Sequence, residues 1–145
     1  MFHFEEGEVF LIDKPLDWTS FDAVNLIRSV IKRYHGIRKL KVGHAGTLDP
    51  LATGLLIICT GRMTKQIDNF QAQEKVYTGT MLLGQTTPTY DLESEPDAFY
   101  PTDNITEEMM EEARKSFLGD IMQRPPKFSA IKIQGKRAFE YARSD

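Results

Sequence analysis

Residues 42–60 read VGHAGTLDPLATGLLIICT and join a glycine-rich loop to a short apolar run. The run over residues 55–60 is too short for an ordinary helix and predicts a buried β-strand. Cys59 is expected in the core of that strand. The residues before the run predict a loop whose backbone can approach a ligand closely, because they include three glycines, at positions 43, 46 and 54.

A single carboxylate, Asp49, stands among these glycines and is followed by Pro50. A proline disfavours the helical conformation of the residue before it, so Asp49 is expected to be extended. A fixed carboxylate on such a loop can act as a nucleophile or a general base. An Asp-Pro pair also starts ordinary turns, and the local sequence leaves both interpretations open. The loop lacks the Gly-Lys-Ser/Thr ending of a phosphate-binding loop.

The residues before this loop predict a strand and a helix. Residues 8–13 (EVFLID) form an apolar run that stops at Lys14-Pro15, which indicates a second buried strand. Apolar residues recur at helical spacing over residues 23–31, and Gly36 is expected to end this helix. Its candidate N-caps are Thr19, Ser20 and Asp22.

The residues after the loop predict further elements of both kinds. A short helix is expected over 64–70, and residues 75–85 (KVYTGTMLLGQ) have β character. Thr106 is expected to cap a helix that runs to Phe117 and turns Met109 and Met110 toward a core. A strand over 128–133, a turn at 134–135 and a helix over 138–143 complete the pattern. Because strands and helices mix without a regular βαβ order, we expect an α+β fold with a largely antiparallel sheet flanked by helices.

Composition excludes several classes of protein. The 145 residues fit one domain, and the lone cysteine excludes an intramolecular disulfide and a cysteine-built zinc site. The three histidines lack the spacing of a metal motif. No apolar run approaches the roughly 20 residues of a membrane span, and the acidic N-terminus does not resemble a signal peptide. We therefore expect a cytoplasmic protein with neither metal nor membrane partner.

The net charge of −3 hides a strong asymmetry. Residues 28–65 contain eight Lys and Arg and one acid, whereas residues 91–113 contain nine acids and no base. The basic stretch suits a polyanionic partner, and it equally suits a solvated protein face. Two other side chains are also open to two interpretations. His44 is either structural or a donor to phosphate or base, and Tyr77 is either a core aromatic or a ring that stacks on a nucleobase.

Several blocks of this sequence, in order, resemble the N-terminal part of the TruB-type tRNA pseudouridine-55 synthases, the bacterial relatives of the dyskerin-type enzymes. Residues 43–50 (GHAGTLDP), continuing through Ala52, Gly54 and Leu55, resemble the block that holds the family's catalytic aspartate. The other matching blocks are Asp13-Lys14-Pro15 with Thr19-Ser20, Lys75-Val76-Tyr77 through Leu83-Gly84, and Pro125-Pro126 with Ser129-Ala130, Lys132, Gly135-Lys136 and Tyr141-Ala142-Arg143.

The resemblance implies an RNA-modifying isomerase that converts a uridine in the T-arm of tRNA to pseudouridine after base flipping, without a cofactor. It implies that Asp49 is catalytic, that Tyr77 stacks on the target uracil, and that Lys14 with Pro15 supports the catalytic loop. Full-length members of the family are expected to be monomers, and the sequence leaves the oligomeric state of this chain open. The residues expected on the RNA-binding side of the site are Lys14, Arg38, Lys39, Lys41, His44, Gly46 and Thr47.

Two departures from the family pattern qualify these expectations. Asp17 stands where the family usually has glycine, and the later motif with an arginine that pairs with the aspartate is missing. Residues 1–145 are thus expected to be the N-terminal portion of a catalytic domain, without the C-terminal RNA-binding domain. The alternative function is a truncated RNA-binding fragment that lacks turnover. A glycosidase or N-glycosylase would need a second acid near Asp49, which the sequence does not indicate.

Overall fold

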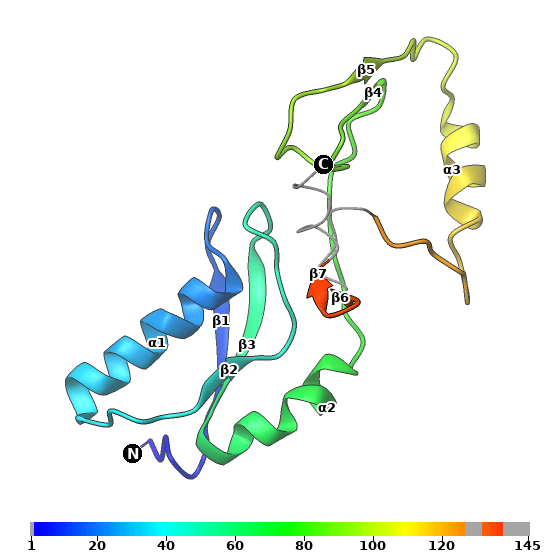
Figure 1. Ribbon diagram of the computed structural model, residues 1–145. Coiled ribbons are helices and arrows are strands. Elements are labelled where there is room, and N and C mark those ends of the chain that lie inside the picture. Colours follow the sequence, from blue (N-terminus) through cyan, green and yellow to red (C-terminus); the bar gives the residue numbers. More distant parts are fainter. Residues whose placement is uncertain (1, 127–131, 138–145) are drawn as a thin grey trace. The chain divides into compact units, whose positions relative to one another are not determined.

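The computed structural model describes residues 2–126 and 132–137 (Figure 1). It divides into two units, Met1–Thr78 and Gly79–Asp145. Each unit has its own secondary structure, and each is described by itself below. The candidate site lies in the first unit.

The first unit is built on a three-stranded antiparallel sheet of β1 (Val9–Lys14), β2 (Val42–His44) and β3 (Gly54–Thr60). The strand order is β1-β3-β2, so β3 lies in the middle. Pairing runs from Val9 opposite Cys59 to Lys14 opposite Gly54. Both strands expected from the apolar runs are confirmed, and the short β2 lies within the stretch that was expected to be mostly loop.

Helix α1 (Ser20–His35) packs along this sheet (Figure 1). It begins after Thr19, whose side chain accepts a hydrogen bond from the Asp22 backbone while the Asp22 carboxylate accepts one from the Thr19 backbone. This reciprocal pair satisfies two N–H groups that a helix start leaves free. The helix ends at Gly36, whose φ of 70° is easily reached only without a Cβ. The helix expected from the sequence is therefore confirmed at both ends.

The core lies between α1 and one face of the sheet. Ala23 and Val24 of the helix pack with Leu56 and Ile58 of β3, and all four are buried. Cys59 is also fully buried, as expected, and burial raises the pKa of its thiol. Strand residues alternate between faces, and the opposite face is only partly covered: Leu11 is 68% and Leu55 64% exposed, whereas Cys59, on the same face as Leu55, is buried.

The first unit closes with a short helical segment followed by irregular chain. The 3₁₀ helix η1 (Gly61–Gln66) leads into α2 (Ile67–Gln71), which confirms the helix expected there. The strand expected over 75–85 is wrong for all but its last residue, since only Gln85 is in a strand. A strand forms only where a neighbour completes its ladder of hydrogen bonds, and no described strand pairs with residues 75–84.

The second unit holds small elements joined by long connections. Strands β4 (Gln85–Thr86) and β5 (Ala98–Phe99) pair antiparallel, as do β6 (Lys132–Ile133) and β7 (Lys136–Arg137) around the expected turn at 134–135. Helix α3 (Glu107–Lys115) is capped by Thr106 as expected. The rest of the strand expected over 128–133 and the helix over 138–143 lie outside the described residues.

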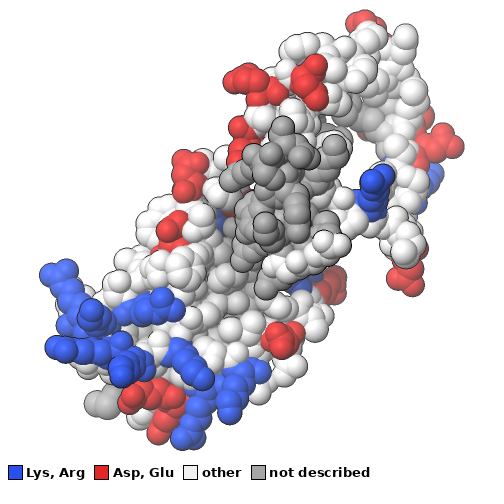
Figure 2. Space-filling view, viewed as in Figure 1, with Lys and Arg blue, Asp and Glu red and all other residues white. Residues whose placement is uncertain are grey.

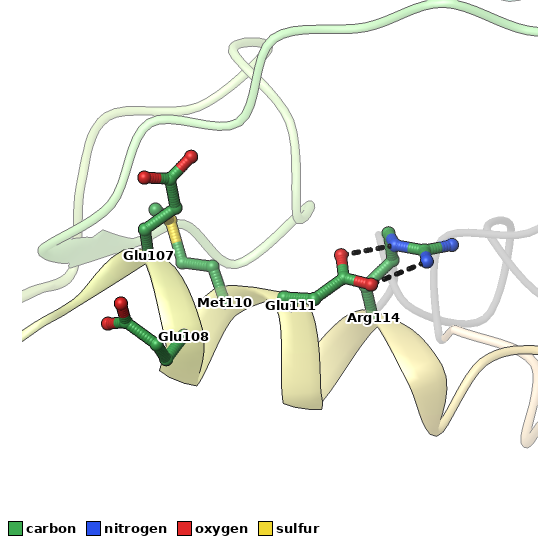
Figure 3. A pocket seen from close by; sticks show the side chains of 5 residues that line it. All are labelled: Glu107, Glu108, Met110, Glu111 and Arg114. Carbon is green, nitrogen blue, oxygen red and sulfur yellow. Dashed lines mark hydrogen bonds and ion pairs between the residues drawn. The ribbon is translucent and has the colours of Figure 1, made fainter.

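The expected core side of α3 is wrong. All its residues are exposed, with Met109 55% and Met110 47% accessible, so neither methionine lies in a core among the described residues. Five of its residues border a shallow hollow in which Arg114 makes a two-pronged ion pair with Glu111 (Figure 3). This pair lies on one exposed helix, and it lowers the pKa of the Glu111 carboxyl.

Candidate active site

Asp49 lies in a tight turn between β2 and β3, at the tip of the glycine-rich loop. The backbone N–H of Ala52 donates to the Asp49 carbonyl at 3.0 Å, which makes Asp49 the first residue of a four-residue turn with Pro50 second. The side chain is exposed, and among the described residues no cation or hydrogen-bond donor contacts its carboxylate. The turn interpretation of Asp-Pro is therefore correct, and it leaves the carboxylate available for chemistry.

The backbone on both sides of Asp49 is held by the segment that leads into α1. The Ser20 hydroxyl donates to the Leu48 carbonyl at 3.1 Å and accepts from the Leu48 N–H at 2.9 Å. The backbone N–H of Asp17 donates to the Pro50 carbonyl at 2.9 Å. The side chain of Leu48 also packs against the core cluster. Asp49 thus stands between two tethered residues.

Lys14 supports this arrangement from inside the unit. Its side chain is fully buried, and its ammonium donates to the carbonyls of Pro15 at 3.0 Å and Trp18 at 2.6 Å. A buried ammonium is tolerated only where hydrogen bonds replace its hydration, and these two carbonyls accept from two of its three N–H groups. The side chain offers no surface to RNA, so the placement agrees with the supporting role and not with direct RNA contact.

His44 and Gly46 shape the start of the loop. The Nδ1 atom of His44 lies 2.6 Å from the Gly46 carbonyl oxygen. Because a carbonyl can only accept, we place a proton on Nδ1, which leaves Nε2 of the half-buried ring for another partner. Gly46 has a φ of 106°, a backbone conformation that side chains strain to adopt. Thr47, which follows, is exposed.

Tyr77 borders the same region from the other side. A hollow of about 700 Å³ is lined by residues 45–48 and 51–57, by Phe70 of α2 and by residues 73–78, which include Glu74 and Tyr77. Tyr77 is 69% exposed, so the core-aromatic interpretation is wrong and the ring is free to stack. Glu74 was not singled out from the sequence, and no contact joins it to Asp49 in the described structure.

A basic surface lies at the far end of α1 from Ser20. Figure 2 shows Lys and Arg gathered there, at the end of α1 and over the loop that follows it. The N–H of Gly61 donates to the Lys41 carbonyl at 2.9 Å, which brings the start of η1 to the same place. Arg28 is engaged elsewhere, because it donates to the Val42 carbonyl. We define the basic surface as six exposed residues: Lys32, Arg33, Arg38, Lys39, Lys41 and Arg62.

Sequence reasoning named Asp17 and Ser20 but did not predict that they hold the loop. Ser20 reads as one of three candidate caps, and nothing in the sequence signals its bond to a residue 28 positions away. Within residues 2–126 and 132–137, no three metal-ligating side chains come together. No helix in that part of the chain is long and apolar enough to cross a membrane.

The fold and the site together define an α+β domain that presents one carboxylate on a glycine-rich turn, next to a hollow with an exposed tyrosine. The chain belongs to the TruB family of pseudouridylate synthases, because the profile of that family's N-terminal domain matches residues 32–145. The family resemblance of the sequence is thereby confirmed.

Curated relatives give the same family. The chain is 59% identical over 140 residues to the tRNA pseudouridine synthase B of Parabacteroides distasonis, 60% over 141 to that of Phocaeicola vulgatus, and 50% over 139 to that of Chlorobaculum tepidum. These matches cover 97%, 97% and 96% of this chain, and 60%, 60% and 57% of the relatives. The chain therefore spans somewhat less than two thirds of the length of these relatives.

Proposed function

We propose that this chain carries the catalytic aspartate of a tRNA pseudouridine synthase and that residues 1–145 are the N-terminal portion of its catalytic domain. The observation that carries the proposal is Asp49, exposed on a turn that is tethered on both sides. Its neighbours Leu48 and Leu51 line the hollow that Tyr77 also lines. The names of the curated relatives supply the reaction and the kind of RNA. The site of action is then the cytoplasm, where tRNA is modified.

The reaction is an isomerisation, and its atoms balance within the substrate. The N1–C1′ bond of uridine breaks, the base turns, and a C5–C1′ bond forms. C5 loses its hydrogen to water and N1 gains one, so no oxidant or reductant is consumed. Cleavage of such a glycosidic bond develops positive charge at C1′, which a nearby carboxylate stabilises electrostatically or captures covalently.

Asp49 and Tyr77 have different roles at the target nucleotide: Asp49 reacts at the sugar, and Tyr77 stacks on the base. The base must leave its stack to reach Asp49, because its reacting bond is inaccessible within a helix or a folded loop. The exposed ring of Tyr77 replaces the lost stacking, an interaction worth about 1–3 kcal/mol per base on aromatic platforms. Nε2 of His44, Gly46 and Thr47 contact the RNA backbone around the extruded nucleotide.

The basic surface binds phosphates away from the target. Helix α1 has 16 residues, and at 1.5 Å per residue the basic end lies roughly 20 Å from the Asp49 turn. Arg38, Lys39 and Lys41 are exposed there and are the strongest candidates for phosphate contacts. We propose a tRNA T-arm as the partner, because a folded arm can reach both places at once.

The test is pseudouridine formation by this chain and by Asp49→Asn. The substrate is a T-arm stem-loop labelled with tritium at uridine C5, and tritium released to water is counted. Asp68→Asn is the matched control, because it makes the same change at an exposed aspartate on α2. We expect release by the chain and the control, and a loss of at least about a thousandfold in Asp49→Asn.

The other outcomes separate the competing functions. Salt-sensitive binding of the stem-loop without tritium release would support the RNA-binding fragment that lacks turnover. Label recovered as free uracil instead of in water would identify an N-glycosylase. Equal release by Asp49→Asn and the parent chain would refute the assignment of the catalytic aspartate.

A further inference from the structure

Ser20 forms the most specific contact between α1 and the loop that carries Asp49. Its hydroxyl donates to one backbone group of Leu48 and accepts from the other, at 3.1 and 2.9 Å. Only a group that is donor and acceptor at once can do this, and among side chains of this size the hydroxyl is that group. Ser20 is 3% exposed, so water does not easily replace either bond.

This hydroxyl is not needed to start the helix. Thr19 already occupies the N-cap, where its side chain accepts from the Asp22 N–H at 3.1 Å. The two hydrogen bonds made by the Ser20 side chain both go to Leu48 and none to α1 itself. A serine at this position therefore serves the loop and not the helix.

The opposite side of Asp49 is tethered by backbone alone. The Asp17 N–H bonds to the Pro50 carbonyl, and the buried ammonium of Lys14 holds the carbonyls on either side of this short segment, at Pro15 and Trp18. Position 49 is thus fixed from residue 48 by Ser20 and from residue 50 by Asp17, and Thr19 bonds to neither residue. Of these tethers, only the two hydrogen bonds of the Ser20 hydroxyl join a side chain directly to the loop.

We propose that Ser20 is a positioning residue, which holds the backbone at Leu48 so that Asp49 is aimed at the sugar of the target nucleotide. This inference rests on the proposed function, in which Asp49 is the reacting carboxylate. Small displacements of reacting groups lower rates strongly, whereas binding of RNA phosphates by the basic surface does not depend on residue 48. Loss of the hydroxyl should therefore affect turnover more than RNA binding.

The experiment compares Ser20→Ala with Thr19→Ala in the full chain. Both changes remove one hydroxyl at the start of α1, but only the first removes the bonds to Leu48. Kinetics on the T-arm stem-loop are measured below the melting temperature of both variants. We expect kcat to fall at least about tenfold in Ser20→Ala with KM changed less than about threefold, and kcat to change less than about twofold in Thr19→Ala.

Amide hydrogen exchange supplies a readout that does not need activity. In Ser20→Ala, exchange over residues 47–52 should rise at least about tenfold, and in Thr19→Ala the rise should be confined to the first turn of α1. Equal kcat losses in the two variants, or unchanged exchange over 47–52 in Ser20→Ala, would overturn the proposal. If the parent chain makes no pseudouridine, the proposed function fails, and the exchange comparison still decides whether Ser20 holds the loop.

Discussion

At the scale of single residues, Asp17 has a backbone conformation that its side chain strains to adopt. Its φ is 64°, in the left-handed region where glycine is most comfortable and aspartate is tolerated better than most residues. The same residue donates its N–H to Pro50. The family usually has glycine at this position, and the positive φ of Asp17 is the physical reason why glycine suits it.

The prediction at this position is a pair of substitutions. Asp17→Gly should change the free energy of unfolding by less than about 1 kcal/mol, because the strain relieved is offset by greater freedom of the unfolded chain. Asp17→Val should lower it by about 1–3 kcal/mol, because a β-branched side chain resists a positive φ. Urea unfolding followed by Trp18, the one tryptophan of the chain, measures both. Equal stability of the two variants would contradict the argument from φ.

At the scale of elements, α1 joins the core to the candidate site. Its buried face packs on β3, its first residue holds the Asp49 loop, and its last turn carries Lys32 and Arg33. Basic residues in a last turn also suit the negative end of the helix dipole. The first residue of the helix, Ser20, therefore serves the site, whereas the cap at Thr19 serves the fold.

The predicted effect of pH concerns this helix start. The pKa of Asp22 is lowered, first by the hydrogen bond from the Thr19 hydroxyl and then by the one from the Thr19 N–H. A carboxyl whose pKa is lower in the folded state contributes stability above its unfolded pKa, and this contribution is lost as the pH falls through the folded value. Between pH 6 and pH 3, the parent chain should therefore lose more stability than Asp22→Asn.

Urea unfolding at the two pH values measures this difference. Asp68→Asn provides the control, because it removes the same charge from an aspartate that is not part of a capping pair. An acid-induced loss in Asp22→Asn as large as that of the parent chain would show that the capping pair does not set the dependence on pH.

At the scale of the whole molecule, the main basic and acidic stretches of the sequence lie in different units. The basic surface lies in the first unit, and the acidic stretch from residue 91 to 113 lies in the second. A surface that binds phosphates releases counterions from RNA, so its contribution appears in the dependence of affinity on salt. The contribution of the basic surface to RNA binding can therefore be measured from how affinity changes with salt concentration.

The prediction concerns the combined substitution of Arg38, Lys39 and Lys41 by glutamine. The slope of log affinity against log salt for the T-arm stem-loop should become shallower by about 2–3, and affinity should weaken similarly for different loop sequences. Fluorescence anisotropy from 50 to about 300 mM salt measures the slope. Lys115→Gln, at an exposed lysine of the acidic helix α3, should leave it unchanged. An unchanged slope in the triple variant would mean that the basic surface is only a solvated face.

The sequence by itself determined the α+β class, the two buried strands β1 and β3, both ends of α1, and the family. These features depend on apolar periodicity, caps and a dense motif, which are local signals. The strand expected over 75–85 and the buried face of α3 were wrong, because ladder pairing and burial depend on what lies alongside an element. Only the tertiary structure decided that Lys14 is buried, that Tyr77 is exposed, and that Ser20 holds Leu48. Contacts between residues far apart in the chain arise from the folding of α1 onto the sheet, and no local pattern encodes them.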